Sequence, residues 1–142
     1  MDDHDDVTSE EFYYFVEVCK KLKNYLGIID WELRFHFMEG GPEDPRASMQ
    51  VVDRYNRLAV ITIYDDWDIA PSRDNLIKVA FHEMLELLFS DCHCLAMDRN
   101  FNYDTYDREH HRVIRILEHT FLDRIRGDFE SIDIQDDSGE GS

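Results

Sequence analysis

The sequence predicts a single α+β domain containing a helix, a three-stranded, mainly antiparallel sheet, and two further helices, in that order. Apolar residues recur at helical spacing before residue 27 and after residue 104, whereas strand-like runs lie between residues 31 and 64. The chain has 142 residues, about the length of one domain, and 43% of them are hydrophobic. That composition is sufficient for a buried core, and it argues against general disorder.

A first helix is expected from residue 8 to about residue 26. Thr8 and Glu11 have the spacing of a capping box, in which each side chain accepts a hydrogen bond from the other residue's backbone N–H. Apolar side chains then recur every three or four residues. Gly27 follows the last of them and supplies the stop that many helices take after their final turn.

Three strands are expected next. Residues 31–37 alternate between apolar and polar side chains, which is typical of a strand with one buried face. Residues 40–45 include two glycines and two prolines and are expected to form a loop. Residues 47–53 and 58–64 are separated by four residues, short enough for a hairpin. Because the later strand is apolar on both faces, it should lie deep in the fold or under a helix.

Two helices complete the predicted fold. The Pro-Ser pair at residues 71–72 sets up the start of a helix that is apolar almost all round across residues 76–89, as expected of a buried central helix. Residues 90–103 are interpreted as irregular. A last helix is expected from about residue 104 to residue 126, with Gly127 ending it.

The net charge of −17 is concentrated in part at the two ends of the chain. Residues 1–7 are interpreted as an acidic tail, residues 8–127 as the folded domain, and residues 128–142 as a second acidic tail. Ten of the 32 acidic residues lie in these two tails. No basic face is available to neutralise phosphates, so direct binding to nucleic acid is not expected.

Composition also indicates the compartment. No run of about 18 apolar residues occurs, so no membrane span is expected. The first residues are acidic, unlike the basic start of a signal peptide. The cysteines, Cys19, Cys92 and Cys94, are odd in number, and two of them are one residue apart, which argues against a disulfide framework. We therefore expect a cytoplasmic protein with reduced thiols.

Across residues 79–89 of the central helix, three ionisable residues interrupt the apolar side chains. His82 and Glu86 are four residues apart and project from one face, whereas Glu83 lies about 100° further round. Burying two carboxylates costs several kcal/mol each unless a cation or a donor offsets the cost. A zinc ion accepts imidazole and carboxylate ligands and leaves a position for water, on which Glu83 would act as base. The alternative is a partly solvated helix edge with ordinary hydrogen bonds.

The segment His-Glu-Met-Leu-Glu at residues 82–86 resembles the His-Glu-x-x-His helix of zincin metallopeptidases, with Glu in place of the second His. The order of elements over about residues 10–126 is similar to that of small zincin-like proteins of tailed bacteriophages. In that family the last helix gives an acidic third ligand just before a run like His-Arg-Val-Ile. The resemblance therefore implies His110 as third zinc ligand, with its neighbours Glu109 and His111 as alternatives.

Two other groups of potential ligands have simpler interpretations. His110 shares a helix stripe with Ile114 and Leu117, so it is expected to face inward, where a hydrogen-bonded core histidine is the simpler interpretation. Residues 92–94, Cys-His-Cys, offer soft ligands, but their one-residue spacer is tighter than in structural zinc sites. We interpret them as a loop with two reduced thiols.

Two functions fit this pattern. The first is a zinc-dependent peptidase that acts on a peptide or protein substrate, with Glu83 as general base. The substrate would add a strand beside the metal helix, at residues 58–64 or a neighbouring strand. The second is a non-catalytic acidic inhibitor or adaptor that imitates nucleic acid and binds a basic host or defence protein. A phage origin would place either function in the host cytoplasm.

Overall fold

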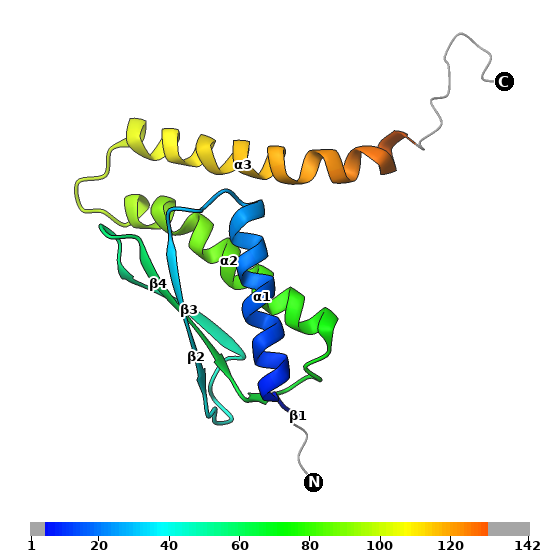
Figure 1. Cartoon of the computed structure of the whole chain (residues 1–142). Helices are drawn as coiled ribbons and strands as arrows, with labels where there is room; N and C mark the ends of the chain where they lie inside the picture. The colour runs from blue at the N-terminus through cyan, green and yellow to red at the C-terminus, as the bar shows by residue number, and fades with distance from the viewer. Residues whose placement is uncertain (1–4, 131–142) are drawn as a thin grey trace, which may run out of the picture.

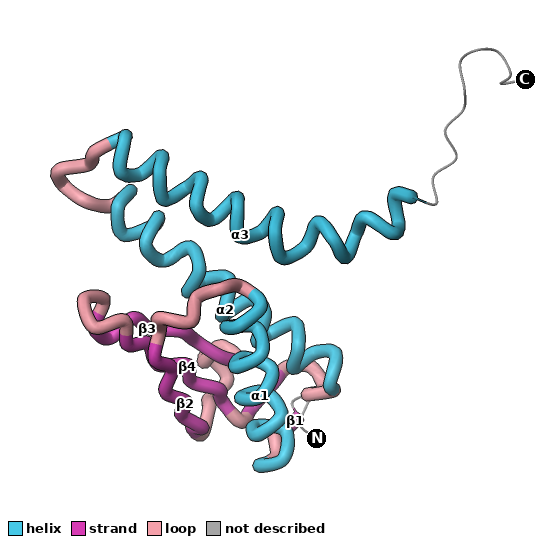
Figure 2. The backbone as a smooth tube through the Cα atoms, turned by 45° about the horizontal axis from the view of Figure 1, so that its top comes forward, coloured by secondary structure: helices cyan, strands magenta, loops and turns pink. Residues whose placement is uncertain are grey.

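The structure, a computed structural model, describes residues 5–130. Its elements are β1 (Asp5–Asp6), α1 (Ser9–Tyr25), β2 (Glu32–Met38), β3 (Ala47–Asp53), β4 (Leu58–Tyr64), β5 (Asp66–Trp67), α2 (Arg73–Ala96) and α3 (Tyr103–Glu130). The sheet forms one layer, α1 and α2 pack together beside it, and α3 lies across α2 (Figures 1 and 2). The predicted α+β class and order of elements are confirmed.

The ends of α1 agree with the prediction in detail. The Thr8 N–H donates to Glu11 Oε1 at 2.8 Å, and the Glu11 N–H donates to Thr8 Oγ1 at 3.2 Å, which completes the capping box. The helix ends at Tyr25, and Gly27 follows with φ of 69°, a conformation that costs other residues about 1 kcal/mol or more. The inner face of α1 carries the fully buried Phe15 and Cys19.

The sheet has the order β2-β4-β3, with β4 in the centre. The hairpin from β3 to β4 is antiparallel as predicted, but β2 pairs with β4 in parallel, so the sheet is mixed rather than mainly antiparallel. The reason is the apolar character of β4, whose residues Ala59, Ile61 and Ile63 are fully buried. Because β4 takes the protected central position, β3 lies at an edge of the sheet. The chain reverses direction between β2 and β3 and again between β3 and β4, so β2 and β4 run in the same direction.

The core lies between the sheet and the helices. Its largest fully buried side chains are Trp31, Trp67, Phe15, Leu26, Ile28, Ile61, Ile63, Leu76, Met84, Leu87, Leu88 and Val113. Burying a large apolar side chain of this kind contributes about 1.5 to 3 kcal/mol relative to leaving it in water. These residues come from both helix and strand, so burial of the core fixes the side of α2 that faces inward.

The central helix is longer than predicted. α2 continues to Ala96, so residues 90–96 are helical instead of irregular, and the Cys-His-Cys group lies in the last turns of a helix instead of a loop. No glycine or proline interrupts this stretch. In addition, Asp91 accepts hydrogen bonds from Arg54 and Arg57 of the β3–β4 connection, which holds these turns against the hairpin. α3 likewise runs past Gly127 to Glu130.

The N-terminal segment is partly built into the fold. Residues 1–7 were expected to form a tail, but Asp5–Asp6 pairs antiparallel with β5, and Val7 is 5% exposed. Residues 1–4 and 131–142, which include most of the predicted C-terminal tail, lie outside the described residues. Among the helices of residues 5–130, none is long and apolar enough to cross a membrane.

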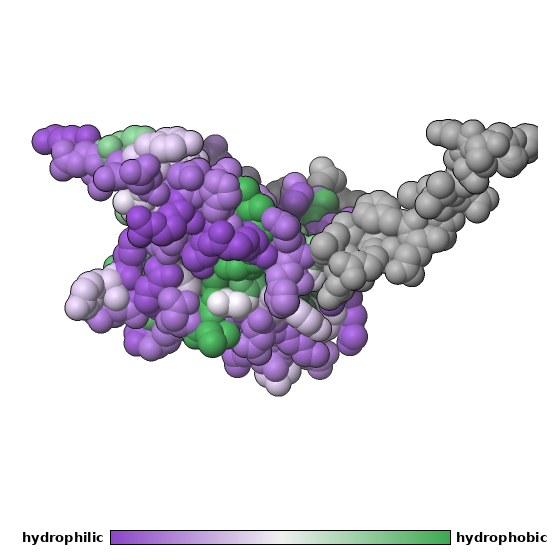
Figure 3. Space-filling view, turned by 90° about the horizontal axis from the view of Figure 1, so that it is seen from above, coloured by the Kyte–Doolittle hydropathy of each residue, from purple (hydrophilic) through white to green (hydrophobic). Residues whose placement is uncertain are grey.

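The face seen from above is mostly hydrophilic, with a small apolar area near its centre (Figure 3).

Candidate metal centre

The three predicted site residues of α2 lie at the boundary between the buried and the exposed side of the helix. Ser72 caps the helix by accepting a hydrogen bond from the Asn75 N–H at 3.2 Å. His82 and Glu86 project to solvent, with side chains 69% and 52% exposed, whereas Glu83 is only 5% exposed. The helix is therefore less completely buried than predicted. It presents the His82–Glu86 pair at the surface, beside the buried carboxylate of Glu83.

The structure brings these three side chains together as the sequence predicted. One ligand atom from each of His82, Glu83 and Glu86 lies within 4.8 Å of the other two. His82 Nε2 and Glu86 Oε1 are 3.2 Å apart. Two tetrahedral ligands about 2.1 Å from one zinc ion are themselves about 3.4 Å apart, so this pair matches the spacing that such an ion requires.

Glu83 is the electrostatically unusual member of the group. Its Oε2 atom is buried and has no hydrogen-bond partner among the residues that the structure describes. Loss of hydration raises the pKa of the Glu83 carboxyl from its ordinary 4.5 to about 7, with a further contribution from the negative charge of Glu86 and an opposing one from His82. A buried oxygen without a donor is the kind of group that a nearby cation stabilises.

A hollow of about 630 Å³ opens beside this group, and both His82 and Glu83 lie in its wall. The other walls come from residues 41–47, from β5 and the residues after it, and from the first turns of α2. Its ionisable lining residues are Asp44, Arg46, Asp66, Asp68, Lys78, His82 and Glu83. Four carboxylates against one Lys and one Arg make the lining net negative, which favours a cation.

One ion pair joins two residues that line this hollow. Arg46 Nε donates to Asp68 Oδ1 at 2.6 Å, and a second guanidinium nitrogen donates to Asp68 Oδ2 at 3.0 Å. This two-point pairing joins the residue before β3 to the residue after β5. No local pattern in the sequence indicates this pair, because 22 positions separate the two residues.

His110 is not among the side chains gathered at this site. Asp91 Oδ2 lies 3.9 Å from an Arg112 guanidinium nitrogen, so the part of α3 that carries His110 lies beside the last turns of α2. Asp91 is nine residues from His82, about 13 Å along a helix. Across residues 5–130, no ligand group joins His110 to His82 and Glu86 within 4.8 Å.

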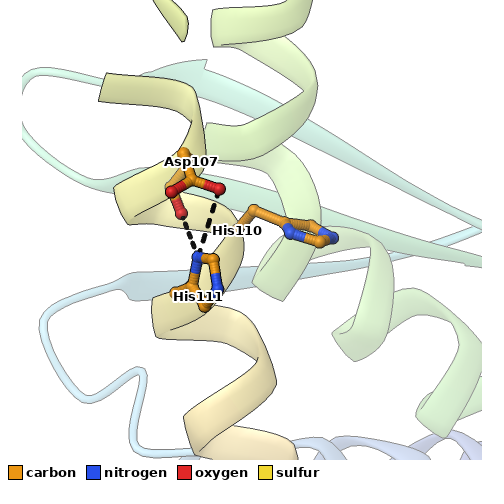
Figure 4. A group of neighbouring side chains, drawn as sticks. All are labelled: Asp107, His110 and His111. Atoms are coloured by element: carbon orange, nitrogen blue, oxygen red, sulfur yellow. Dashed lines mark hydrogen bonds and ion pairs between the residues drawn. The ribbon is translucent and has the colours of Figure 1, made fainter. Parts of the chain in front are cut away.

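The residues around His110 are engaged with one another. Arg112 Nε donates to both carboxylate oxygens of Glu109, at 2.8 and 3.1 Å, which occupies one of the alternative third ligands. The other alternative, His111, contacts Asp107 (Figure 4). The inward side of α3 differs from the prediction at one position, because Val113 is 1% exposed whereas Ile114 is 38% exposed; Tyr106, Leu117 and Phe121 pack against the core as predicted.

Comparisons with protein-family models, with characterised proteins and with solved structures find no match to this chain. The resemblance to phage zincin-like proteins therefore rests on the residues of the chain itself.

Proposed function

We propose that this protein is a zinc-dependent peptidase of zincin type. The observation that carries the proposal is the position of Glu83, whose buried and unpartnered Oε2 lies in the wall of a hollow beside the exposed His82–Glu86 pair. A carboxylate kept without a donor has no evident structural task, whereas a general base needs an available oxygen next to the reacting groups.

The donor set suits zinc. His82 and Glu86 would hold the ion through an imidazole nitrogen and a carboxylate oxygen, both of which zinc accepts. The negative lining of the hollow and the unpartnered Glu83 oxygen favour a divalent cation at the same place. Bound zinc supplies a Lewis acid that polarises a scissile carbonyl and makes water a stronger acid.

Glu83 would take the proton from the attacking water. Its neighbour His82 is directed to the exposed face, while Glu83 itself is shielded from bulk solvent, so its charge is poorly hydrated and readily accepts a proton. A proton held at Glu83 can then pass to the leaving amine of the cleaved peptide. This role needs a carboxylate that can accept a proton. Glu83→Gln keeps the size of the side chain but removes that ability, so it tests the role directly.

The substrate would bind along β3. β4 has both of its edges paired, so it cannot receive another strand, whereas β3 lies at the edge of the sheet and packs against α2. Ala47, the first residue of β3, also lines the hollow that contains His82 and Glu83. An extended peptide added to the free edge of β3 would therefore pass next to these side chains.

The deciding experiment measures zinc content and peptide hydrolysis in protein purified without an affinity tag. His82→Ala should contain about one zinc ion per chain fewer than wild type, whereas His36→Ala, which changes an exposed histidine of β2, should contain as much as wild type. Glu83→Gln should bind zinc normally and lose about two to four powers of ten in turnover. Full activity in Glu83→Gln, or no hydrolysis of any peptide library by zinc-loaded wild type, would instead favour the acidic inhibitor.

A further inference from the structure

A second cluster of potential metal ligands lies on α3. Asp107, His110 and His111 each offer a ligand atom, and these atoms lie within 4.8 Å of one another. The residues occupy positions i, i+3 and i+4 of one helix, so the backbone itself holds them on neighbouring parts of one surface. Figure 4 shows the side chains of Asp107 and His111 next to each other, one turn apart on α3.

The Asp107–His111 pair already has the spacing of two ligands. His111 Nδ1 lies 3.3 Å from Asp107 Oδ1 and 2.8 Å from the Asp107 carbonyl oxygen. Ligands about 2.1 Å from one ion are about 3.0 Å apart in an octahedral site and about 3.4 Å apart in a tetrahedral one. A cation between the two side chains would replace the proton that Nδ1 shares with Asp107.

His110 is the third member of the cluster. Its ring stacks on Tyr106, with centroids 5.8 Å apart and an angle of 11° between the planes, and it points away from the other pair (Figure 4). Binding therefore requires the imidazole to turn toward Asp107 and His111, a side-chain rotation that leaves the helix unchanged. The side chains of Asp107 and His111 are 42% and 55% exposed, so an ion can reach them from solvent without unfolding.

One neighbouring positive charge, that of Arg112, is directed elsewhere. Arg112 is the basic residue next to His111 in the chain, and its guanidinium pairs with Glu109 and approaches Asp91 of α2. These contacts hold the Arg112 charge at the interface between the helices, away from the exposed His111. The same contacts place the cluster near the end of α2, more than two helical turns from His82.

We propose that Asp107, His110 and His111 bind one late first-row divalent cation, such as zinc or nickel, independently of the α2 site. Two imidazoles and one carboxylate select these ions over calcium and magnesium, which prefer all-oxygen sites. Because α3 begins at Tyr103, the ion would join side chains of its second and third turns and stabilise the N-terminal part of the helix. The site needs no residue of α2, so a result that contradicts the peptidase proposal would not contradict this site.

Calorimetric titration of the untagged protein with zinc alone tests the site. Wild type should show two binding events, and His111→Ala and His110→Ala should each remove the same one. Loss of a supporting contact typically weakens metal binding 10- to 100-fold, so loss of a ligand should weaken this event by at least about 100-fold. Circular dichroism checks that the exposed substitutions leave the fold intact, and Asp107→Asn, which keeps the side-chain size, should weaken the same event.

Two matched variants complete the design. His119→Ala changes an exposed histidine of the same helix outside the cluster, and it should leave both events unchanged. His82→Ala should remove only the other event, the one assigned to α2. Unchanged binding in both His110→Ala and His111→Ala, an equal loss in His119→Ala, or loss of all binding in His82→Ala would each overturn the α3 site. Loss in His111→Ala with no effect of His82→Ala would support it and count against the α2 metal.

Discussion

Glu83→Gln should change how the free energy of unfolding of the metal-free protein depends on pH. The folded protein raises the pKa of Glu83 from 4.5 to about 7, mainly because the buried carboxylate loses hydration. Between these two values the unfolded chain loses the proton while the folded chain keeps it. The folded state then binds more protons, so stability falls as pH rises through this window.

The magnitude follows from the pKa difference. One pKa unit corresponds to about 1.4 kcal/mol, so the change from 4.5 to about 7 corresponds to about 3 kcal/mol at full ionisation. Between about pH 5 and about pH 8 wild type should lose about 2 to 3 kcal/mol through this residue. Gln cannot ionise, so Glu83→Gln should lack this loss and gain stability relative to wild type as pH rises.

Urea denaturation with a chelator present measures the free energy of unfolding of wild type and of Glu83→Gln at about pH 5 and about pH 8. The effect is the change between the two pH values in wild type minus the same change in Glu83→Gln. Any pH-independent cost of placing an amide at this position cancels. Glu118→Gln, which removes an exposed glutamate of α3, controls for the general effect of one charge. If wild type and Glu83→Gln change in parallel with pH, Glu83 does not hold a proton in the folded state, and the reasoning from its burial is refuted.

Three further changes test the fold. Met84→Ala removes a fully buried side chain of α2 and should cost about 2 to 5 kcal/mol of unfolding free energy in urea denaturation; a cost below about 1 kcal/mol would contradict the core described above. Thr8→Ala breaks the capping box and should cost about 0.5 to 2 kcal/mol in thermal unfolding, and no measurable cost would show that the box contributes little. Asp91→Ala leaves Arg54 and Arg57 without their shared acceptor and should cost about 1.5 to 3 kcal/mol, and full stability would show that this contact does not hold the hairpin against α2.

Local signals predicted most element boundaries correctly. The capping box at Thr8 and the stop at Gly27 need only residues close in sequence, and both appear in the structure. The two hairpin strands also agree with the prediction, because the connector between them is short and their apolar pattern is clear. In each case a few neighbouring residues contain the whole signal.

Predictions that depended on distant contacts were less complete. The extra turns of α2 and the parallel pairing of β2 with β4 follow from contacts between residues far apart in the sequence, such as Arg57 with Asp91. The hollow beside Glu83 likewise needs Arg46 and Asp68 to meet across 22 positions. The residue pattern within one segment cannot predict contacts between residues so far apart in the sequence.

The sequence by itself determined that His82, Glu83 and Glu86 are neighbours, because helical geometry places residues one turn apart side by side. Only the tertiary structure decided that Glu83 is buried while His82 and Glu86 face solvent, since this depends on which side of α2 packs against the core. It also decided that His110 does not join the α2 group. That outcome depends on the register between two packed helices, which is set by contacts such as Arg112 with Asp91 and not by the spacing within either helix.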